Sequence, residues 1–415
     1  MKLLMAVMLA LAAPVAARPP SIPSADAPQL AAVGPYPVGL QPASVTVPGG
    51  MRTLTLMIWY PALAQPGATP TTYRRHLTPA DAAPLDITTE GIAVAAAPPA
   101  AGRFPLVVIS HGFGGWAGGM TYLAENLATK GYVVASIDHA DGQGGSGGAE
   151  GRLRVAGSIV NRARDQQAVV AQLTARAAGR DALASHIDAG NIAVIGYSMG
   201  GFGVLATGGA PYDKASATVA QLSGRLDDQT TRTPVPGLKA IVAIAPWGGQ
   251  PQYRAWTPAG LAGITVPSLF IAGDHDDVSV YGDGIKWLYD HATASNRWLL
   301  TYREARHNVG GNPPPPETFA RADLAENFIE PVWRSDRINA INQHFITAFL
   351  DRFLKRDASH GEFLDVPTVD SDDAVWTPQP AAPGFAGAAQ AGYWPGFQRR
   401  WLLGLELRHN AATGR

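Results

Sequence analysis

The sequence predicts an α/β fold with a mostly parallel central sheet, helices on both faces and long loop insertions. Short, continuous apolar runs, typical of strands buried on both faces, alternate with helical patterns along most of the chain. Such alternation favours right-handed βαβ units. Three of the runs end directly before polar or glycine-rich turns that carry candidate reactive side chains. Reactive groups gather at the carboxyl ends of parallel strands, so these turns are expected to meet.

The individual elements follow from apolar periodicity. Continuous runs rich in branched and aromatic residues indicate strands at 53–60, 104–110, 132–138, 191–195, 238–245, 267–272 and 298–302. Apolar residues three and four positions apart indicate helices at 120–130, 158–177, 199–207, 284–294 and 335–354. Two stretches rich in Pro and Ala, 18–32 and 65–101, are expected to be a loose lead-in and an irregular excursion.

The N-terminus carries the pattern of a secretory signal peptide. Lys2 precedes an apolar run at 3–13, and small residues follow at 15–17. A membrane anchor is the alternative, but the run is well short of the ~20 residues that span a bilayer. We therefore expect a signal peptide at 1–17, a catalytic domain at 18–357 and a C-terminal extension at 358–415 packed on that domain. The protein is expected to be periplasmic or secreted, with no stable membrane insertion after signal cleavage.

Charge and composition exclude several classes of protein. The 32 Lys and Arg residues nearly balance the 33 Asp and Glu residues, which gives a net charge of -1. No basic field is present to hold a phosphate backbone, so we expect no nucleic-acid partner. The apolar content of 46% excludes disorder of the whole chain. The absence of cysteine excludes disulfides, thiolate metal sites and a cysteine nucleophile.

The main chemical signal is the motif GYSMG at 196–200, which fits the G-x-S-x-G pattern. It lies between a predicted strand and a predicted helix, which is the context that this motif requires. The sharp turn needs small residues at both ends, and it lifts the Ser198 hydroxyl above the sheet. The next helix points its amino terminus at that hydroxyl, where developing negative charge is favoured. We therefore expect Ser198 to be a nucleophile; the alternative is a glycine-rich turn with an unreactive serine.

The base and the acid are expected after the last two strands. His307 follows the strand at 298–302, and it comes after an acidic turn, as the chain order Ser, acid, His requires. That turn offers Asp274, Asp276 and Asp277. Asp276, the fourth residue of the turn, is expected to orient His307 and to stabilise its protonated form, with the other two as alternatives. Three nearby carboxylates also suggest a divalent-cation site, but the stretch lacks the glycine-containing loop of specific Ca²⁺ sites, and we expect no metal.

An oxyanion hole needs two backbone N–H donors aimed at the reacting carbonyl oxygen. Met199, the residue after the nucleophile, is expected to supply one. The loop HGFGG at 111–115, directly after the strand at 104–110, is expected to supply the other from Phe113 and to place Gly112 against the substrate. A loop that cradles phosphate is the alternative, but no G-x-x-x-x-G-K-[ST] or spaced G-x-G-x-x-G pattern accompanies it.

The motifs HGFGG, GYSMGG, GDHDDVS and EARHN, each after a predicted strand, resemble those of the α/β-hydrolase superfamily. Within it, WYPA at 59–62, GYVVASIDHADG at 131–142 and FLDRFLKRD at 349–357 are similar to dienelactone-hydrolase-like and platelet-activating-factor-acetylhydrolase-like serine esterases. The resemblance spans residues 33–357 and implies the α/β-hydrolase fold. It departs from the dienelactone hydrolases proper, which use a cysteine nucleophile, and this departure argues against dienelactone as the substrate.

A second similarity is local. APW at 245–247 and ITVPSLFIAGDHD at 264–276 resemble cutinase-like polyester hydrolases, in which a tryptophan after this strand flanks the substrate cleft. The resemblance implies that Trp247 lines the substrate site, and it places the family's acid on Asp276. The alternative for Trp247 is a core aromatic residue.

Together these residues predict an exported serine hydrolase that cleaves carboxylic esters through an acyl-enzyme. The substrate is a small-molecule or polymeric ester, and no cofactor or metal is implied. An amidase or peptidase that uses the same three residues is the alternative among enzymes. A non-catalytic binding protein with this fold is the alternative outside them. The insertion at 308–333 is expected to shape the wall of the cleft.

Overall fold

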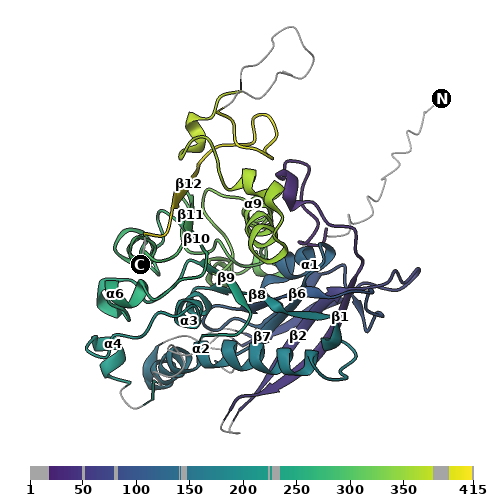
Figure 1. The fold of residues 1–415 in the computed structure, drawn as a ribbon, viewed down its shortest axis with the longest axis horizontal. Helices are drawn as coiled ribbons and strands as arrows, with labels where there is room; N and C mark the ends of the chain where they lie inside the picture. Colours follow the sequence, from purple (N-terminus) through teal and green to yellow (C-terminus); the bar gives the residue numbers. More distant parts are fainter. Residues whose placement is uncertain are drawn as a thin grey trace, which may run out of the picture.

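The computed structural model describes residues 18–48, 52–78, 83–139, 141, 147–222, 225–226, 234–376 and 392–413. The predicted signal peptide at 1–17 lies outside these residues. Within them, ten strands form one sheet, and helices lie against both of its faces (Figure 1). The predicted α/β class with a mostly parallel sheet is confirmed.

The elements have the following bounds. The central sheet contains β1 (Val38–Thr46), β2 (Thr53–Pro61), β5 (Val94–Ala95), β6 (Phe104–Ser110), β7 (Val133–Asp138), β8 (Ile187–Tyr197), β9 (Leu238–Ile244), β10 (Ser268–Gly273), β11 (Arg297–Tyr302) and β12 (Leu405–Asn410). A separate hairpin consists of β3 (Thr72–Leu77) and β4 (Leu85–Glu90). The α-helices are α1 (Thr121–Thr129), α2 (Gly148–Ala177), α3 (Met199–Thr207), α4 (Ala217–Ala220), α6 (Pro258–Leu261), α7 (Trp287–His291), α8 (Ala322–Ala325) and α9 (Ser335–Leu350). Shorter helical pieces include η1 (Gln29–Ala31), η5 (Tyr281–Lys286), η6 (Pro316–Thr318) and η7 (Asp351–Lys355).

The strands are ordered β12-β11-β10-β9-β8-β6-β7-β2-β1-β5. From β11 to β7 every neighbouring pair is parallel, whereas β12, β2 and β1 join antiparallel near the edges. All seven residues of β6 are buried, as the continuous apolar run predicts for a strand covered on both faces. Helices α1 and α9 pack together on one face, and α2 and α3 pack together on the other (Figure 1). The carboxyl ends of the parallel strands therefore all open at one edge of the sheet.

Five strands were not expected from the sequence. The stretch 65–101, expected to be irregular, contains the β3–β4 hairpin and β5. β1 was not predicted because Pro42 interrupts its apolar pattern. The strand tolerates that proline because β5 pairs only with Gly39 and Leu40, so β1 has a single neighbour further along. β12 was not predicted either, because only Leu405 and Leu407 of this short edge strand are buried.

The lead-in at 18–32 is not loose, contrary to expectation. Ser21 and Ala31 are fully buried, and the Leu30 N–H donates to His344 Nδ1 of α9 over 3.1 Å. Asn126 Nδ2 of α1 donates to the Ala31 carbonyl oxygen over 2.8 Å. Small Ala and Ser side chains let the backbone approach both helices closely, so a composition typical of loops here forms a packed strap.

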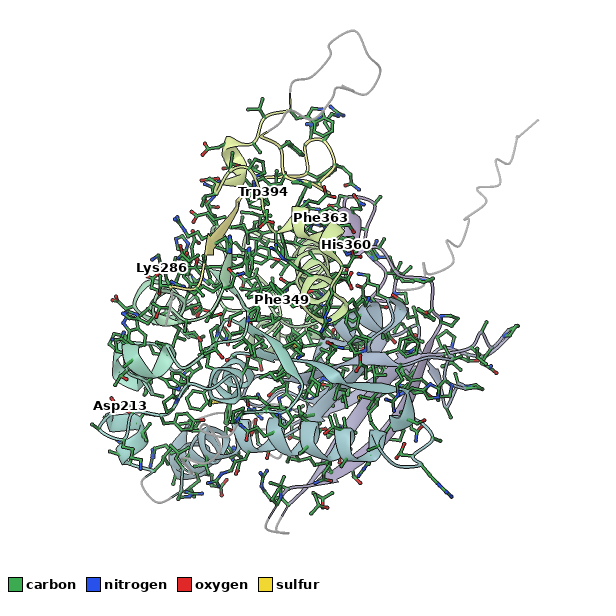
Figure 2. The ribbon with its side chains drawn as sticks, in the orientation of Figure 1. Asp213, Lys286, Phe349, His360, Phe363 and Trp394 are labelled. Atoms are coloured by element: carbon green, nitrogen blue, oxygen red, sulfur yellow. The ribbon has the colours of Figure 1, made fainter. Side chains whose placement is uncertain are left out.

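The C-terminal extension packs on the same core. Phe363 and Trp394 lie near α9 (Figure 2). The ring centroid of Trp394 is 6.1 Å from that of Phe345 in this helix. β12 then completes the sheet next to β11. Helix α2 begins at Gly148, ten residues before its predicted start, because glycines and half-exposed residues hide the pattern of its first turns. No helix in the described parts of the chain is long and apolar enough to cross a bilayer.

Candidate active site

The GYSMG motif forms a strained turn between β8 and α3. Ser198 has φ 53° and ψ −113°, a backbone conformation that residues other than glycine rarely adopt. Holding a residue in such a conformation costs about 1–3 kcal/mol. The Ser198 N–H donates to the Ile244 carbonyl oxygen over 2.8 Å. Its own carbonyl oxygen accepts from the N–H groups of Trp247 at 3.1 Å and Phe202 at 3.0 Å. These three bonds hold the strained residue in place.

Both glycines of the motif are required by space. A Cβ at Gly196 would lie 2.2 Å from the carbonyl oxygen of Gly200, and one at Gly200 would lie 2.0 Å from that of Ser110. The backbone at each end of the turn therefore has no room for a side chain. This crowding explains why the G-x-S-x-G spacing found in the sequence belongs to this turn.

Ser198, His307 and Asp276 form one hydrogen-bonded row at the carboxyl edge of the sheet. His307 Nε2 lies 3.0 Å from Ser198 Oγ, and His307 Nδ1 lies 2.8 Å from Asp276 Oδ2. The ionised carboxylate only accepts, so Nδ1 carries the proton and Nε2 is free to accept from the serine hydroxyl. The other carboxylate oxygen accepts from the N–H groups of Val278 at 2.9 Å and Ser279 at 2.7 Å. The Asp276 side chain is fully buried, whereas the His307 side chain keeps 12% of its surface exposed.

The alternative acids point elsewhere. Asp274 Oδ1 accepts from the Glu304 N–H over 2.7 Å and contacts the His275 ring at the same distance. Asp277 pairs with Arg306 at 2.8 Å, where both side chains are more than half exposed. The three carboxylates of the turn thus face three different partners. Within the described residues, no group of three His, Asp or Glu side chains is placed to hold a metal ion.

The HGFGG loop lies directly beside the serine. A Cβ at Gly112 would be 3.3 Å from the Ser198 Cβ, so the loop backbone lies against the Ser198 side chain. The carbonyl oxygen of Gly112 accepts from His111 Nδ1 at 2.6 Å, Gly115 N at 3.1 Å and Arg162 Nη2 at 3.2 Å. These bonds fix the turn that carries Phe113. Met199, the first residue of α3, adjoins the serine on its other side.

The β3–β4 hairpin also reaches this loop, through a residue that the sequence analysis missed. Arg75 Nη2 donates to the Gly114 carbonyl oxygen over 2.5 Å, and its guanidinium lies 5.9 Å from the centre of the Trp116 ring. Burial lowers the pKa of Arg75, and the negative charge of Asp138 opposes that effect. No sequence signal marks Arg75, because the segment that carries it was expected to be irregular.

A second Ser–His–Asp row begins at Ser110, directly before the HGFGG loop, and was not predicted. His139 Nε2 lies 2.8 Å from Ser110 Oγ, and its Nδ1 lies 2.9 Å from Asp165 Oδ2. Ser110 and Asp165 are at most 1% exposed. His139 is 4% exposed as a residue and 1% exposed in its side chain. Burial lowers the pKa of His139 well below its usual value, as do the positive charges of Arg162 and Arg52. These effects favour the neutral form of His139, and the row is closed to solvent.

Trp247 follows β9 at the same edge of the sheet. Its ring is half-buried, with its centroid 5.6 Å from that of core residue Phe202 and 5.4 Å from that of Tyr253, on which it stacks. Tyr253 is 48% exposed. The Trp247 ring thus joins the core to the exposed ring of Tyr253, next to Ser198.

Known proteins similar to this chain are consistent with the geometry. A family model described as serine aminopeptidase, S33, matches residues 103–245, which include the HGFGG and GYSMGG motifs. A cutinase of Thermobifida fusca (strain YX) is 24% identical over 75% of this chain and 85% of its own length. Cutinase 1 of Thermobifida cellulosilytica is 24% identical over 62% and 71%, respectively. A bis(hydroxyethyl) terephthalate hydrolase of Streptomyces coelicolor (strain ATCC BAA-471 / A3(2) / M145) is 24% identical over 50% and 51%. The resemblance to dienelactone hydrolases and platelet-activating-factor acetylhydrolases stays a prediction.

Proposed function

Because this chain is an α/β-hydrolase and a carboxylic ester hydrolase, we propose that it works through an acyl-enzyme on Ser198, with His307 as the base and Asp276 as the acid that orients it. The observation that carries the proposal is the continuous row from Ser198 Oγ to His307 and on to Asp276, at 3.0 and 2.8 Å. The strained backbone of the serine and the 9% of its surface that stays exposed support the role of nucleophile.

In the first half of the reaction, Ser198 Oγ attacks the ester carbonyl carbon while His307 Nε2 takes the hydroxyl proton. Asp276 stabilises the imidazolium that forms. The negative charge that develops on the carbonyl oxygen is stabilised by the N–H groups of Phe113 and Met199. The intermediate then collapses, His307 returns the proton to the departing alkoxide, and the alcohol leaves.

In the second half, water replaces the alcohol. His307 takes a proton from a water molecule, whose oxygen attacks the acyl carbon bound to Ser198. The second tetrahedral intermediate collapses when the proton returns to Ser198 Oγ, and the carboxylic acid is released. The cycle needs no cofactor or metal, because each role has a side chain or a backbone N–H to fill it.

We propose esters with a flat or bulky group next to the scissile bond as the substrates, small or polymeric. The relatives named as cutinases and as a bis(hydroxyethyl) terephthalate hydrolase support this choice. The half-buried Trp247, stacked on the exposed Tyr253, supports it as well, since aromatic faces attract flat groups. With the signal-peptide pattern at 1–17, we propose that the enzyme acts in the periplasm or outside the cell.

An amidase or peptidase that uses the same residues is the second candidate. The description of the matching family model, serine aminopeptidase, is the observation that favours it. Aminoacyl p-nitroanilides and p-nitrophenyl acetate distinguish the two. We expect turnover of the ester to exceed that of any anilide by at least about 100-fold in kcat/KM, a difference of about 2.7 kcal/mol in the barrier.

Partitioning between water and methanol tests the acyl-enzyme. Phenyl benzoate and p-nitrophenyl benzoate share an acyl group and differ in the leaving group. If both pass through one benzoyl-Ser198 intermediate, the ratio of methyl benzoate to benzoate is the same for the two substrates. A ratio that changes with the leaving group would mean direct attack by solvent and would overturn the proposal.

A further inference from the structure

The insertion between His307 and α9 carries a buried carboxylate that the mechanism does not use. Glu330 is 3% exposed and lies near the end of the segment 308–333. The pKa of its carboxyl group is raised, chiefly by burial and also by the negative charge of Asp276, although hydrogen bonds from two backbone N–H groups and the neighbouring His307 oppose that effect. Within the described residues no Lys or Arg pairs with Glu330. A carboxylate in such a place is expensive to bury, so its contacts need an explanation.

Glu330 binds the backbone on both sides of His307. Its Oε2 accepts from the Arg306 N–H over 2.5 Å, and its Oε1 accepts from the Asn308 N–H over 2.6 Å. Hydrogen bonds to an ionised acceptor are short and about twice as strong as neutral ones. The two carboxylate oxygens therefore fix the backbone of the residues directly before and after His307.

Asn308, in the loop that carries His307, also donates hydrogen bonds to the insertion. Asn308 Nδ2 donates to the carbonyl oxygens of Glu326 at 2.7 Å and Ile329 at 3.1 Å, in the turn that precedes Glu330. The carbonyl oxygen of His307 accepts from Tyr197 at 3.1 Å. The His307 carbonyl oxygen is thus bound by Tyr197, the residue before Ser198. The N–H groups on either side of His307 are bound by Glu330 of the insertion.

We propose that Glu330 is a positioning residue that sets the place of the His307 ring, and that the insertion at 308–333 is a brace for the base as well as a wall. The inference rests on the proposed function of His307. The hydrogen bonds of Glu330 go to the backbone N–H groups of Arg306 and Asn308, so it acts on the ring through the backbone. A displacement of about 1 Å in a catalytic group can cost about 100-fold in rate, which makes such a brace worthwhile.

The substitution Glu330→Gln tests the proposal, because an amide keeps the shape but turns one N–H donor toward a backbone N–H donor. Active sites are counted first, by titration to completion with a fluorophosphonate. We then expect kcat per titrated site, measured with p-nitrophenyl acetate, to fall about 10- to 100-fold while KM stays within about twofold. The matched control is Glu326→Gln on the same segment, whose side chain is exposed; it should behave as wild type.

The result that overturns the proposal is a normal kcat per titrated site, whether or not fewer sites titrate, because a merely structural role lowers the number of active molecules and not their rate. If Glu330→Gln does not fold, Asn308→Ala takes its place, since it removes only the two bonds from the amide side chain. It should lower kcat per site by a smaller factor, about 3- to 10-fold, and an unchanged value contradicts the brace. A wild-type protein that titrates no site would instead refute the proposed function.

Discussion

Two Ser–His–Asp rows in the described part of the chain have nearly equal spacings and different surroundings. In the row Ser198–His307–Asp276 the two hydrogen-bond distances are 3.0 and 2.8 Å. In the row formed by Ser110, His139 and Asp165 they are 2.8 and 2.9 Å. Residue types and distances alone would assign both rows the same chemistry. Their backbone, exposure and neighbours differ.

Ser110 ends β6 and is hydrogen-bonded in the sheet between β7 and β8, with no exposed surface. Ser198 lies outside its strand, at a positive φ, and keeps 9% of its surface exposed. Only Ser198 lies both at the start of a helix and beside the HGFGG loop, where N–H groups can face a developing oxyanion. A reactive serine thus needs access to substrate and nearby N–H donors in addition to a histidine partner.

The buried row contacts the loop that lies beside Ser198. The backbone N–H of His139 donates to His111 Nε2 over 3.1 Å, which leaves the His111 proton on Nδ1 to bond the Gly112 carbonyl oxygen. Burial lowers the pKa of His111 well below its usual value, in keeping with a neutral ring. The buried row therefore supports the loop that lies against Ser198.

Alanine at each serine is the test with the largest expected effect. Ser198→Ala should lower kcat about 10⁴-fold or more and leave the melting temperature almost unchanged, because the turn accepts a small side chain. Ser110→Ala should leave kcat within about threefold and lower the free energy of unfolding by about 1 kcal/mol, the worth of one hydrogen bond. Ester turnover and urea unfolding check the pair. Loss of activity in Ser110→Ala alone would reverse the roles of the two rows.

Asparagine at each aspartate comes next. Asp276→Asn favours the wrong tautomer of His307 and should lower kcat by up to ~10⁴-fold, whereas Asp274→Asn and Asp277→Asn should retain most activity. Asp165→Asn should act on stability, by about 2 kcal/mol. That value is below the roughly 3–5 kcal/mol of fully buried pairs, because the partner side chain of Arg52 stays 26% exposed. A crippled Asp277→Asn would place the acid one residue later in the turn.

Acid titration separates the histidines. The pKa of His139 is lower in the folded chain than the ordinary 6.5, so the unfolded state binds more protons as the pH falls below that value. This difference is a source of stability at neutral pH that is lost as the pH falls from about 6.5 toward the folded pKa. In His139→Gln the free energy of unfolding, compared at pH 6 and pH 5, should depend on pH less steeply by about 1 kcal/mol per unit. An unchanged slope would mean that His139 is already protonated in the native state.

Trp247→Ala has the smallest expected effect and tests whether this ring contacts the substrate beside the row Ser198–His307–Asp276. We expect kcat/KM for p-nitrophenyl benzoate to fall about 10-fold and that for the acetate to fall less, because stacking is worth about 0.5–1.5 kcal/mol. Steady-state kinetics on the two esters measure the difference. Equal losses on both substrates, or an unfolded variant, would favour the core-aromatic interpretation of Trp247.

Much of the fold could be predicted because its central strands are continuous apolar runs. The bounds of β6 and α3 agree with the sequence pattern to the residue. Edge elements were harder to predict. β1 contains a proline and β12 buries only two leucines, so neither has the expected alternation over its length. The packing of the lead-in at 18–32 was not predicted, because a Pro- and Ala-rich composition is found both in exposed segments and in segments whose small side chains let them pack.

The site divides in the same way. The turn around Ser198 is local, so its motif is visible in the sequence, and the chain order then restricts the choice of base and acid. The residues at Arg75, His139, Asp165 and Glu330 act across distances of many residues in the chain, with partners that only the folded structure brings close. No spacing rule in one sequence identifies such contacts.

We expect only one of the two serines to react. Labelling the protein with a fluorophosphonate, followed by digestion and mass spectrometry, locates the phosphonyl group. One phosphonyl group per molecule should appear on the peptide that contains Ser198, and none on the peptide that contains Ser110. A label on Ser110 or elsewhere, or ester hydrolysis that continues while Ser198 stays unlabelled, would contradict this expectation.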